Sequence, residues 1–482
     1  MSLTKRFYHG VLWSILGTLF SKGSIFVSTI IVARTLGKND FGQLDIIQST
    51  VGMFGVFAGL GLGLTVTKHV AELYKTNKEK TARIMGLAYL VAVVTSLVIV
   101  IGIIFNASFI ATTVLNAPNL SPLLQIGSLM LFFNTLTGIQ TSALSGLEKF
   151  KDIAFINLSI GIISFPLIVL GVYLYNLKGV VVSLVIISII NFMLNRYFLI
   201  KRLNEVNIAV DYYKSYIELS LLWTYALPAF LSGIMLGPTL WIARTFLTHE
   251  NNGYIALGVF SAVILFQNII YMLSNSINGV LLPILSSKEG KNNILFNQTN
   301  FYISWVIGII LTSPLIFFPE IAEFTLGEKY AGHDFRITLL IIMNVVIIYT
   351  FKQGMARLLA VKNMMWLGSL DNFIWSLILI FVSWNLVDLG AIGLALAFLI
   401  AYIINMLISI PYFIYKKVFS WKLIVNWYVI IVWVIIILNT YISYNFNDIG
   451  LRIGAFLLSA SIFLLSTLFF AKTLKDNKKA IV

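Results

Sequence analysis

Long apolar runs separated by short polar segments make up almost the whole chain. A membrane-spanning helix needs about 20 mostly apolar residues, and runs of this kind recur fourteen times. Their centres lie near residues 23, 55, 93, 132, 164, 188, 232, 267, 306, 345, 376, 402, 432 and 461. The connections are too short to hold a folded soluble domain, the longest being near 200–216, 285–294 and 319–335. The pattern predicts an all-α polytopic membrane protein with fourteen transmembrane helices.

The basic residues alternate between the two sides of these predicted helices. With the N-terminus inside, 25 of the 33 Lys and Arg residues fall in inner segments, among them Lys352 to Lys362 in the loop after the tenth run. Seven fall outside, and Lys22 lies within a run. Because loops rich in Lys and Arg are retained in the cytoplasm, both termini are predicted to be cytoplasmic.

Composition agrees with a membrane protein. Of the 482 residues, 59% are hydrophobic and 11% are charged, whereas soluble proteins carry about 25% charged residues. The net charge of +14 could indicate nucleic acid as a partner. However, the basic residues lie between apolar runs, so loop retention is the better explanation and no nucleic acid is expected. The chain has no cysteine, which excludes disulfides and thiolate sites.

A short motif occurs twice. "VARTL" at 32–36 and "IARTF" at 242–246 each close an apolar run, and each is followed within nine residues by a glycine, Gly42 or Gly253. The two copies end the first and seventh predicted helices, six crossings apart. This spacing predicts two parallel six-helix repeats, and substrate sites of transporters lie between such repeats. The expected division is 1–216 for helices 1–6, 217–416 for helices 7–12, and 417–482 for helices 13–14.

Four segments in order resemble one family. "IIVARTLGKNDFGQ" at 30–43 looks like the first-helix signature of the polysaccharide flippases in the multidrug/oligosaccharidyl-lipid/polysaccharide (MOP) exporter superfamily. Matching segments are "LGLGLTVTKHVAELY" at 60–74, "SALSGLEKFK" at 142–151 and "YALPAFLSGI" at 225–234. The chain resembles the O-antigen (Wzx-type) flippase branch most, and the lipid II flippases more distantly.

This resemblance implies a fold and a function. The fold is the MATE-like MOP fold, with two six-helix lobes around a cavity that opens alternately to either side. The implied substrate is a glycan on undecaprenyl pyrophosphate, moved from the inner to the outer leaflet of the bacterial inner membrane. A polymerase and a chain-length regulator of the same pathway are implied partners. Helices 13–14 are implied to form a groove for the polyprenyl chain.

Three cations are candidates for binding an anionic headgroup. Lys22 lies in mid-run, about twelve residues from either end, too far for its side chain to reach an interface. A charge at that depth is costly, so we expect Lys22 to face a water-filled cavity. Arg34 and Arg244 close their runs and either pair with lipid phosphate or a carboxylate, or line the outer cavity. Together the three suit a pyrophosphate.

Acidic residues are scarce at membrane depth. Asp45 pairs with Arg34 across the outer turn or is a solvated helix-start residue. Asp371 either binds a coupling ion, H⁺ or Na⁺, or pairs with Lys352, Arg357 or Lys362. No other cofactor and no metal site are expected.

Uncharged polar stripes complete the candidate site. Gln48 shares a helical face with Asp45, Ser49 and Gly52. The fourth and eighth runs carry stripes that either bond to neighbouring helices or meet sugar hydroxyls. These stripes are Asn134, Thr137, Thr141 and Ser145, and Gln267, Tyr271, Asn275 and Asn278.

Other functions were weighed against a flippase. A MATE-like drug exporter needs cavity carboxylates, whereas this chain offers cations. A membrane polymerase or ligase needs a large outer loop. The acidic segment 319–335, with Glu320 and Glu323, could hold catalytic carboxylates but reads as an ordinary solvated loop. The glycines of "GLGLGLT" at 59–65 lack the Lys-Ser/Thr of a nucleotide loop and predict close packing within an apolar helix. The sequence therefore predicts a flippase rather than an enzyme.

Overall fold

The computed structural model describes residues 3–276, 294–362, 364–446 and 448–479. Within these residues the secondary structure is helical throughout, without a β-strand. The chain forms two compact units, Met1–Gly258 and Val259–Val482.

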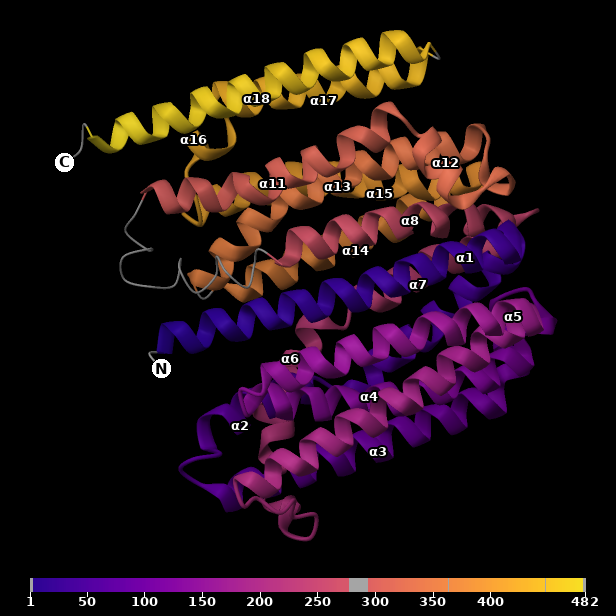
Figure 1. Cartoon of the computed structure of the whole chain (residues 1–482), viewed down its shortest axis with the longest axis vertical. Coiled ribbons are helices and arrows are strands. Elements are labelled where there is room, and N and C mark those ends of the chain that lie inside the picture. The colour runs from indigo at the N-terminus through magenta and orange to yellow at the C-terminus, as the bar shows by residue number, and fades with distance from the viewer. Residues whose placement is uncertain (1–2, 277–293, 363, 447, 480–482) are drawn as a thin grey trace. The chain divides into compact units, whose positions relative to one another are not determined.

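The N-terminal unit is a bundle of long helices, drawn from indigo to magenta in Figure 1. It contains α1 (Leu3–Gly59), α2 (Leu62–Leu73), α3 (Lys78–Phe109), α4 (Ser121–Gly146), α5 (Phe150–Glu205), α6 (Leu227–Gly233) and α7 (Leu236–Thr248). Helix α5 packs on α1 and α4, and α4 also packs on α2 and α3.

Two of these helices consist of two arms each. Helix α1 is interrupted at Gly37, whose φ of 78° suits glycine. Helix α5 has 56 residues, which would extend about 84 Å if straight, more than twice the hydrocarbon core. It turns at Tyr175 and Asn176 instead. A Cβ on Gly179 would lie 1.9 Å from the carbonyl oxygen of Gly171, so only glycine lets the two arms meet there.

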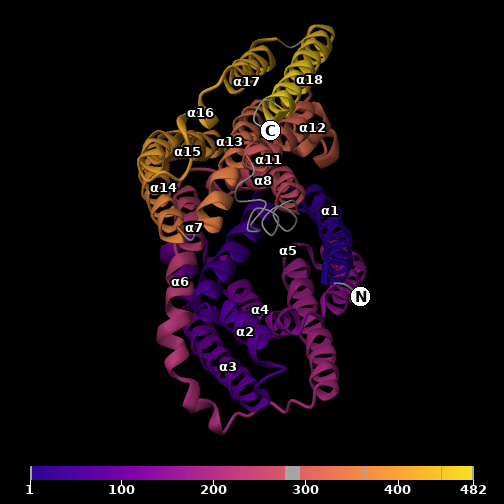
Figure 2. The same cartoon turned by 90° about the vertical axis from the view of Figure 1, so that its left-hand side faces the viewer.

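The C-terminal unit holds α8 (Gly253–Ser276), which starts at the boundary, then α11 (Ile294–Phe317) and the short α12 (Glu320–Leu326). It continues with α13 (His333–Val361), α14 (Met365–Asn385), α15 (Gly390–Tyr415), α16 (Trp421–Ile424), α17 (Trp427–Asn445) and α18 (Ile449–Lys479). Helix α13 is central, packing on α11, α14, α15 and α17. Figure 2 shows α17 and α18 as a pair, and the two helices are in contact.

Eleven helices among the described residues are long and apolar enough to cross a membrane, or twelve if α1 and α2, bent by 46°, form one span. Helix α5 is one of these eleven, although each of its two arms is a separate length of helix. The all-α polytopic fold is therefore confirmed, while the number of fourteen crossings stays a prediction. The division into lobes at 216 and 416 also stays a prediction.

Candidate functional site

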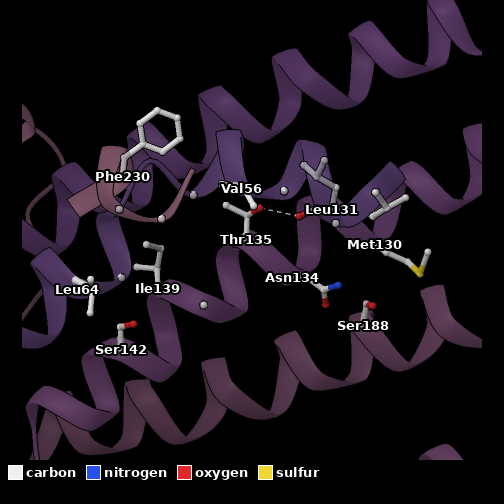
Figure 3. Close-up of a pocket in the computed structure, with 18 of the residues that line it drawn as sticks. Val56, Leu64, Met130, Leu131, Asn134, Thr135, Ile139, Ser142, Ser188 and Phe230 are labelled. Atoms are coloured by element: carbon white, nitrogen blue, oxygen red, sulfur yellow. Dashed lines mark hydrogen bonds between the residues drawn. The ribbon is translucent and has the colours of Figure 1, made fainter. Parts of the chain in front are cut away.

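A cavity of about 790 Å³ opens in the N-terminal unit, between α1, α2, α4, α5 and α6. Figure 3 shows its lining, with Phe230 of α6 at one end of the drawn group and Met130 of α4 at the other. None of the lining residues that the structure describes carries a charge. They are Gln48, Val51, Gly52, Gly55, Val56, Gly59, Gly61, Gly63, Leu64, Met130, Leu131, Asn134, Thr135, Gly138, Ile139, Ser142, Leu184, Ile187, Ser188, Ala229, Phe230 and Gly233.

Glycine builds much of the cavity wall. A Cβ added to five of the lining glycines would meet no atom within 4 Å. These five are Gly52, Gly55, Gly59, Gly138 and Gly233. The helix backbone is therefore the surface that a bound molecule would touch at these positions.

Gly61 has a different role, at the break between α1 and α2. Its φ is +68°, and a Cβ there would lie 2.4 Å from the carbonyl oxygen of Ala226 and 2.8 Å from the nitrogen of Phe230. The close packing expected for the glycines at 59–65 is present at Gly61, and at Gly63, where a Cβ would lie 3.0 Å from the Ser142 hydroxyl, but not at Gly59. The continuous helix expected there is wrong, because Leu60 and Gly61 have positive φ and α2 bends away by 46°.

Two predicted cavity residues, Gln48 of α1 and Asn134 of α4, line this cavity. Both are exposed, and neither side chain has a hydrogen-bond partner among the residues that the structure describes. By contrast, the hydroxyls of Thr135 and Ser188 bond to carbonyls of their own helices, at 2.8 and 2.9 Å. The two amides and the hydroxyl of Ser142, which likewise has no hydrogen-bond partner among the described residues, are thus the cavity side chains with open donors and acceptors.

The predicted cation Arg244 and the predicted acid Asp45 lie together. Nε of Arg244 is 3.1 Å from Oδ2 of Asp45, with side chains 15% and 21% exposed. Neither atom makes an aligned hydrogen bond, so the contact is an ion pair without good donor geometry. Three residues before Arg244 on α7, the indole N–H of Trp241 donates a hydrogen bond to the hydroxyl of Thr50 on α1, at 2.9 Å. Asp45 therefore pairs with the second copy of the repeated motif, where the sequence had suggested Arg34.

Close backbone contacts bring the ends of the two motif copies together. A Cβ on Gly42 would lie 2.1 Å from the carbonyl oxygen of Tyr254, and one on Gly258 would lie 1.8 Å from that of Lys38. The Tyr254 hydroxyl donates to the carbonyl of Leu115 at 2.5 Å. Glycine at 42 is thus required by the packing of the segment after α7 on the turn inside α1.

Lys22 and Arg34 are exposed side chains on the first arm of α1, twelve residues or about 18 Å apart along the helix. Neither lines the cavity. Among the described residues Lys22 has no ion-pair partner. The role of Lys22, Arg34 and Arg244 in binding a headgroup stays a prediction.

In the C-terminal unit, the polar stripe of α8 serves helix packing in part. The Asn275 side chain accepts a hydrogen bond from Gln353 of α13 at 3.0 Å, and Ser274 donates to Gln353 at 2.8 Å. The Tyr271 ring stacks on Tyr349, with centroids 4.0 Å apart. Gln267 is 8% exposed, and its buried Oε1 has no partner among the described residues. Asn278 lies outside the described residues.

Asp371 of α14 forms a buried ion pair. Its Oδ2 lies 2.8 Å from Nζ of Lys352 on α13, with side chains 11% and 12% exposed. Asn405 of α15 accepts from the same ammonium and donates to the backbone carbonyl of Asp371 at 3.0 Å. Of the predicted alternatives, the pairing with Lys352 is present. Among the described residues, no three His, Cys, Asp or Glu side chains form a group that could hold a metal ion.

Lys352 and Arg357 lie in a helix and not in a loop. We expected both in an inner loop, but both lie in α13, and Arg357 is 4% exposed. The Arg357 guanidinium donates to the side chain of Asn300 at 2.6 Å, to its backbone carbonyl at 2.7 Å and to Ser304 at 2.9 Å. These partners lie more than 50 residues away, and the apolar α11 run gave no strong signal of them.

An apolar groove of about 760 Å³ runs between α13, α15, α16 and α17. Ile403 and Leu407 of α15 and Ile437 of α17 are among its exposed lining residues. Its polar groups include Asn344 and Thr440, which hydrogen-bond to each other at 3.1 Å. The surface of the groove is therefore mostly apolar.

The expectation of a solvated outer loop at 319–335 is wrong for Glu323, whereas Glu320 is partly exposed but paired. Glu323 is 8% exposed and accepts two hydrogen bonds from Arg336, at 2.9 and 2.8 Å. Glu320 pairs with Arg452 of α18 at 2.7 Å. Burial raises the pKa of Glu320, but the hydrogen bonds to its carboxylate from Arg452 and from its own backbone, together with the charges of Arg452 and Arg336, hold the pKa below its ordinary value. These acids tie α12 to α13 and α18.

Solved structures share this fold. The lipid II flippase MurJ, in an inward closed conformation, aligns with a TM-score of 0.74 at 19% identity, covering 96% of this chain and 99% of that chain. An inward-facing multidrug resistance MATE family transporter of the MOP superfamily gives 0.65 at 13% identity, covering 83% and 95%. A MOP superfamily transporter from Pyrococcus furiosus gives 0.62 at 13% identity, covering 85% and 96%. These likenesses confirm the predicted MOP fold.

Sequence comparison identifies the family. No curated protein sequence matches the chain. The profile of the polysaccharide biosynthesis protein family, in contrast, matches residues 7–289, which is more than half of the chain. The protein is therefore a multi-pass membrane protein that belongs to the polysaccharide biosynthesis protein family.

Proposed function

We propose that the protein is a flippase for a lipid-linked oligosaccharide. It moves an O-antigen or related repeat unit on undecaprenyl pyrophosphate from the inner to the outer leaflet of the bacterial inner membrane, by alternating access. The observation that carries this proposal is the family match over residues 7–289, which ties a chain with a transporter fold to polysaccharide biosynthesis.

The apolar groove of the C-terminal unit supports a lipid-linked substrate. It is bounded by α13, α15, α16 and α17, and its volume of about 760 Å³ suits part of a long hydrocarbon chain. Burying such a chain releases about 25 cal/mol per Å² of apolar surface. On this proposal the polyprenyl chain lies in the groove while the headgroup crosses.

Lys22, Arg34 and Arg244 bind the pyrophosphate in this account. Lys22 and Arg34 are exposed on α1, and arginine matches phosphate oxygens with two parallel N–H groups. Arg244 is held by Asp45 at 3.1 Å. An arriving pyrophosphate therefore competes with the Asp45 carboxylate for that guanidinium.

Coupling to H⁺ or Na⁺ is assigned to Asp371. Its carboxylate lies against the Lys352 ammonium and the Asn405 amide, so proton or ion binding at Asp371 would have to release Lys352. Movement of that pair would change how α13 and α14 pack.

The charge distribution supports the orientation, with both termini in the cytoplasm. Substrate loading then takes place on the cytoplasmic side and release on the outer side. A polymerase and a chain-length regulator of the same pathway would act on the released product.

The exporter alternative is less well supported. A cationic drug needs an accessible carboxylate, but the two acids predicted at membrane depth, Asp45 and Asp371, are each paired with a base. The glycine-walled cavity has no charged lining residue. We propose transport without bond chemistry rather than polymerase or ligase activity.

The proposal is tested in cells depleted of the protein. Polyprenyl-linked glycans are extracted, and the membrane face that exposes them is determined with an impermeant glycan-modifying reagent. Completed single repeat units on the cytoplasmic face are the expected result. Accumulation on the outer face would indicate a polymerase or ligase, and no accumulation would indicate an exporter of small molecules.

A further inference from the structure

We propose that the glycine-walled cavity of the N-terminal unit binds an uncharged sugar of the glycan and discriminates against acidic sugars. The inference rests on the proposed function and deepens it, because it names the substrate class that the cavity accepts. It is carried by the charge, the hydrogen-bonding groups and the shape of the cavity.

Among the described residues, the lining contains no Asp, Glu, Lys, Arg or His. A uronic acid in this cavity would lose hydration without meeting a cation, and burying an unpaired carboxylate is costly. The nearby cation Arg244 is already paired with Asp45. A neutral hexose or N-acetylhexosamine carries no such penalty.

The open hydrogen-bonding groups fit neutral sugars. Gln48 and Asn134 are exposed, and their amides have no partner among the described residues. Each amide offers donors and an acceptor, which is what hydroxyl and N-acetyl groups require. Because the two residues come from α1 and α4, they approach a bound ring from different helices.

The shape of the cavity also fits a sugar. Its volume of about 790 Å³ lies within the usual range for small-molecule sites, ~300–1,000 Å³. The open glycines let a polar ring approach the helix backbone.

The experiment measures lipid binding to the purified full-length protein in nanodiscs. Three probes are compared: undecaprenyl pyrophosphate, the same lipid bearing one N-acetylhexosamine, and the same lipid bearing one hexuronic acid. We expect the N-acetylhexosamine to tighten binding at least ten-fold over the bare carrier. The hexuronic acid should give no gain.

Filling the cavity should remove this gain selectively. Gly138→Leu places a side chain into open space and should weaken binding of the N-acetylhexosamine lipid at least ten-fold, with the bare carrier unchanged. Asn134→Ala should act in the same direction by several-fold. The matched control is Gly102→Leu, since Gly102 is exposed on α3, meets no atom within 4 Å and does not line the cavity. It should change neither affinity.

The outcomes separate the two proposals. Equal affinity for the neutral and acidic lipids, or equal weakening of all three probes by Gly138→Leu and Asn134→Ala, would overturn the sugar site and leave the flippase proposal intact. Absence of binding by the wild-type protein to every probe would overturn both, because the carrier itself is then not a ligand.

Discussion

Charged side chains within the helices are mostly held by partners from other helices. Arg244 lies against Asp45, Lys352 against Asp371, and Arg357 against Asn300. Such pairing lowers the cost of a charge at membrane depth. Lys22 differs, because it is exposed and has no ion-pair partner among the described residues.

Replacing Lys22 tests its role in headgroup binding. Lys22→Ala should abolish complementation of a deletion strain at an unchanged membrane level, because a positive charge for the pyrophosphate is lost. Lys22→Arg keeps the charge and should retain part of the function. The control is Lys178→Ala, an exposed lysine after the turn in α5, which should remain fully active. Full activity of Lys22→Ala would remove Lys22 from the mechanism.

The Asp45–Arg244 pair is tested by a charge swap. Arg244→Ala leaves the largely buried carboxylate of Asp45 without its ion-pair partner. This should lower the free energy of unfolding of the purified protein by roughly 1–3 kcal/mol. The double variant Asp45→Arg/Arg244→Asp should recover much of that stability in a thermal unfolding assay. It should not recover complementation, since position 244 on α7, which binds pyrophosphate in this account, would be acidic. Restoration of complementation by the swap would limit Arg244 to a structural role.

Interruptions within the helices shape the elements around the cavity. Helix α1 turns at Gly37, α5 turns at Asn176, and α1 gives way to α2 at Gly61. At Gly61 the chain needs both a positive φ and room for the backbone of Ala226. This break sets the direction of α2 beside the glycine-walled cavity.

Alanine scanning of two neighbouring glycines tests the break. Gly61→Ala should lower the free energy of unfolding by more than about 1 kcal/mol, because alanine tolerates neither the φ nor the close approach. Gly59→Ala, two residues earlier, meets no atom within 4 Å and should be neutral or slightly stabilising. Thermal unfolding in detergent provides the comparison. Equal melting temperatures for the two variants would contradict this account of the break.

The apolar groove is tested with a matched pair on α17. Ile437 lines the groove and Leu438 does not, while both are exposed. Ile437→Trp should lower the rate of glycolipid translocation several-fold by occupying space needed for the polyprenyl chain. Leu438→Trp should leave the rate unchanged. Similar rates for both variants would place the chain elsewhere.

How much the sequence could predict depends on whether a feature is local. Apolar runs determine membrane helices directly, so the all-α fold was predictable. Gln48 and Asn134 were found because helical spacing puts polar residues on one face. The partnership of Asp45 with Arg244 was not predictable, since it joins residues 199 positions apart through the packing of Gly42 and Gly258. The turn at Gly61 was missed because a glycine-rich apolar segment is equally compatible with close helix packing.

At the scale of the molecule, the predicted orientation can be tested directly, because the native chain has no cysteine. Single cysteines at exposed positions near helix ends can therefore be labelled uniquely with a membrane-impermeant maleimide. Asp334→Cys, in a predicted outer segment, should react in intact spheroplasts. Glu148→Cys, in a predicted inner loop, should react only after permeabilisation. The opposite pattern would invert the topology and the proposed direction of transport.

The central claim is that this chain moves a lipid-linked glycan across a bilayer. The most direct test reconstitutes the purified protein into liposomes whose inner leaflet alone carries undecaprenyl-pyrophosphate-linked N-acetylhexosamine, and follows its exposure to an external sugar-modifying enzyme. The account predicts exposure at a rate well above that of protein-free liposomes, lost in the Arg244→Ala variant. A rate equal to that of protein-free liposomes, with protein correctly inserted, would contradict it.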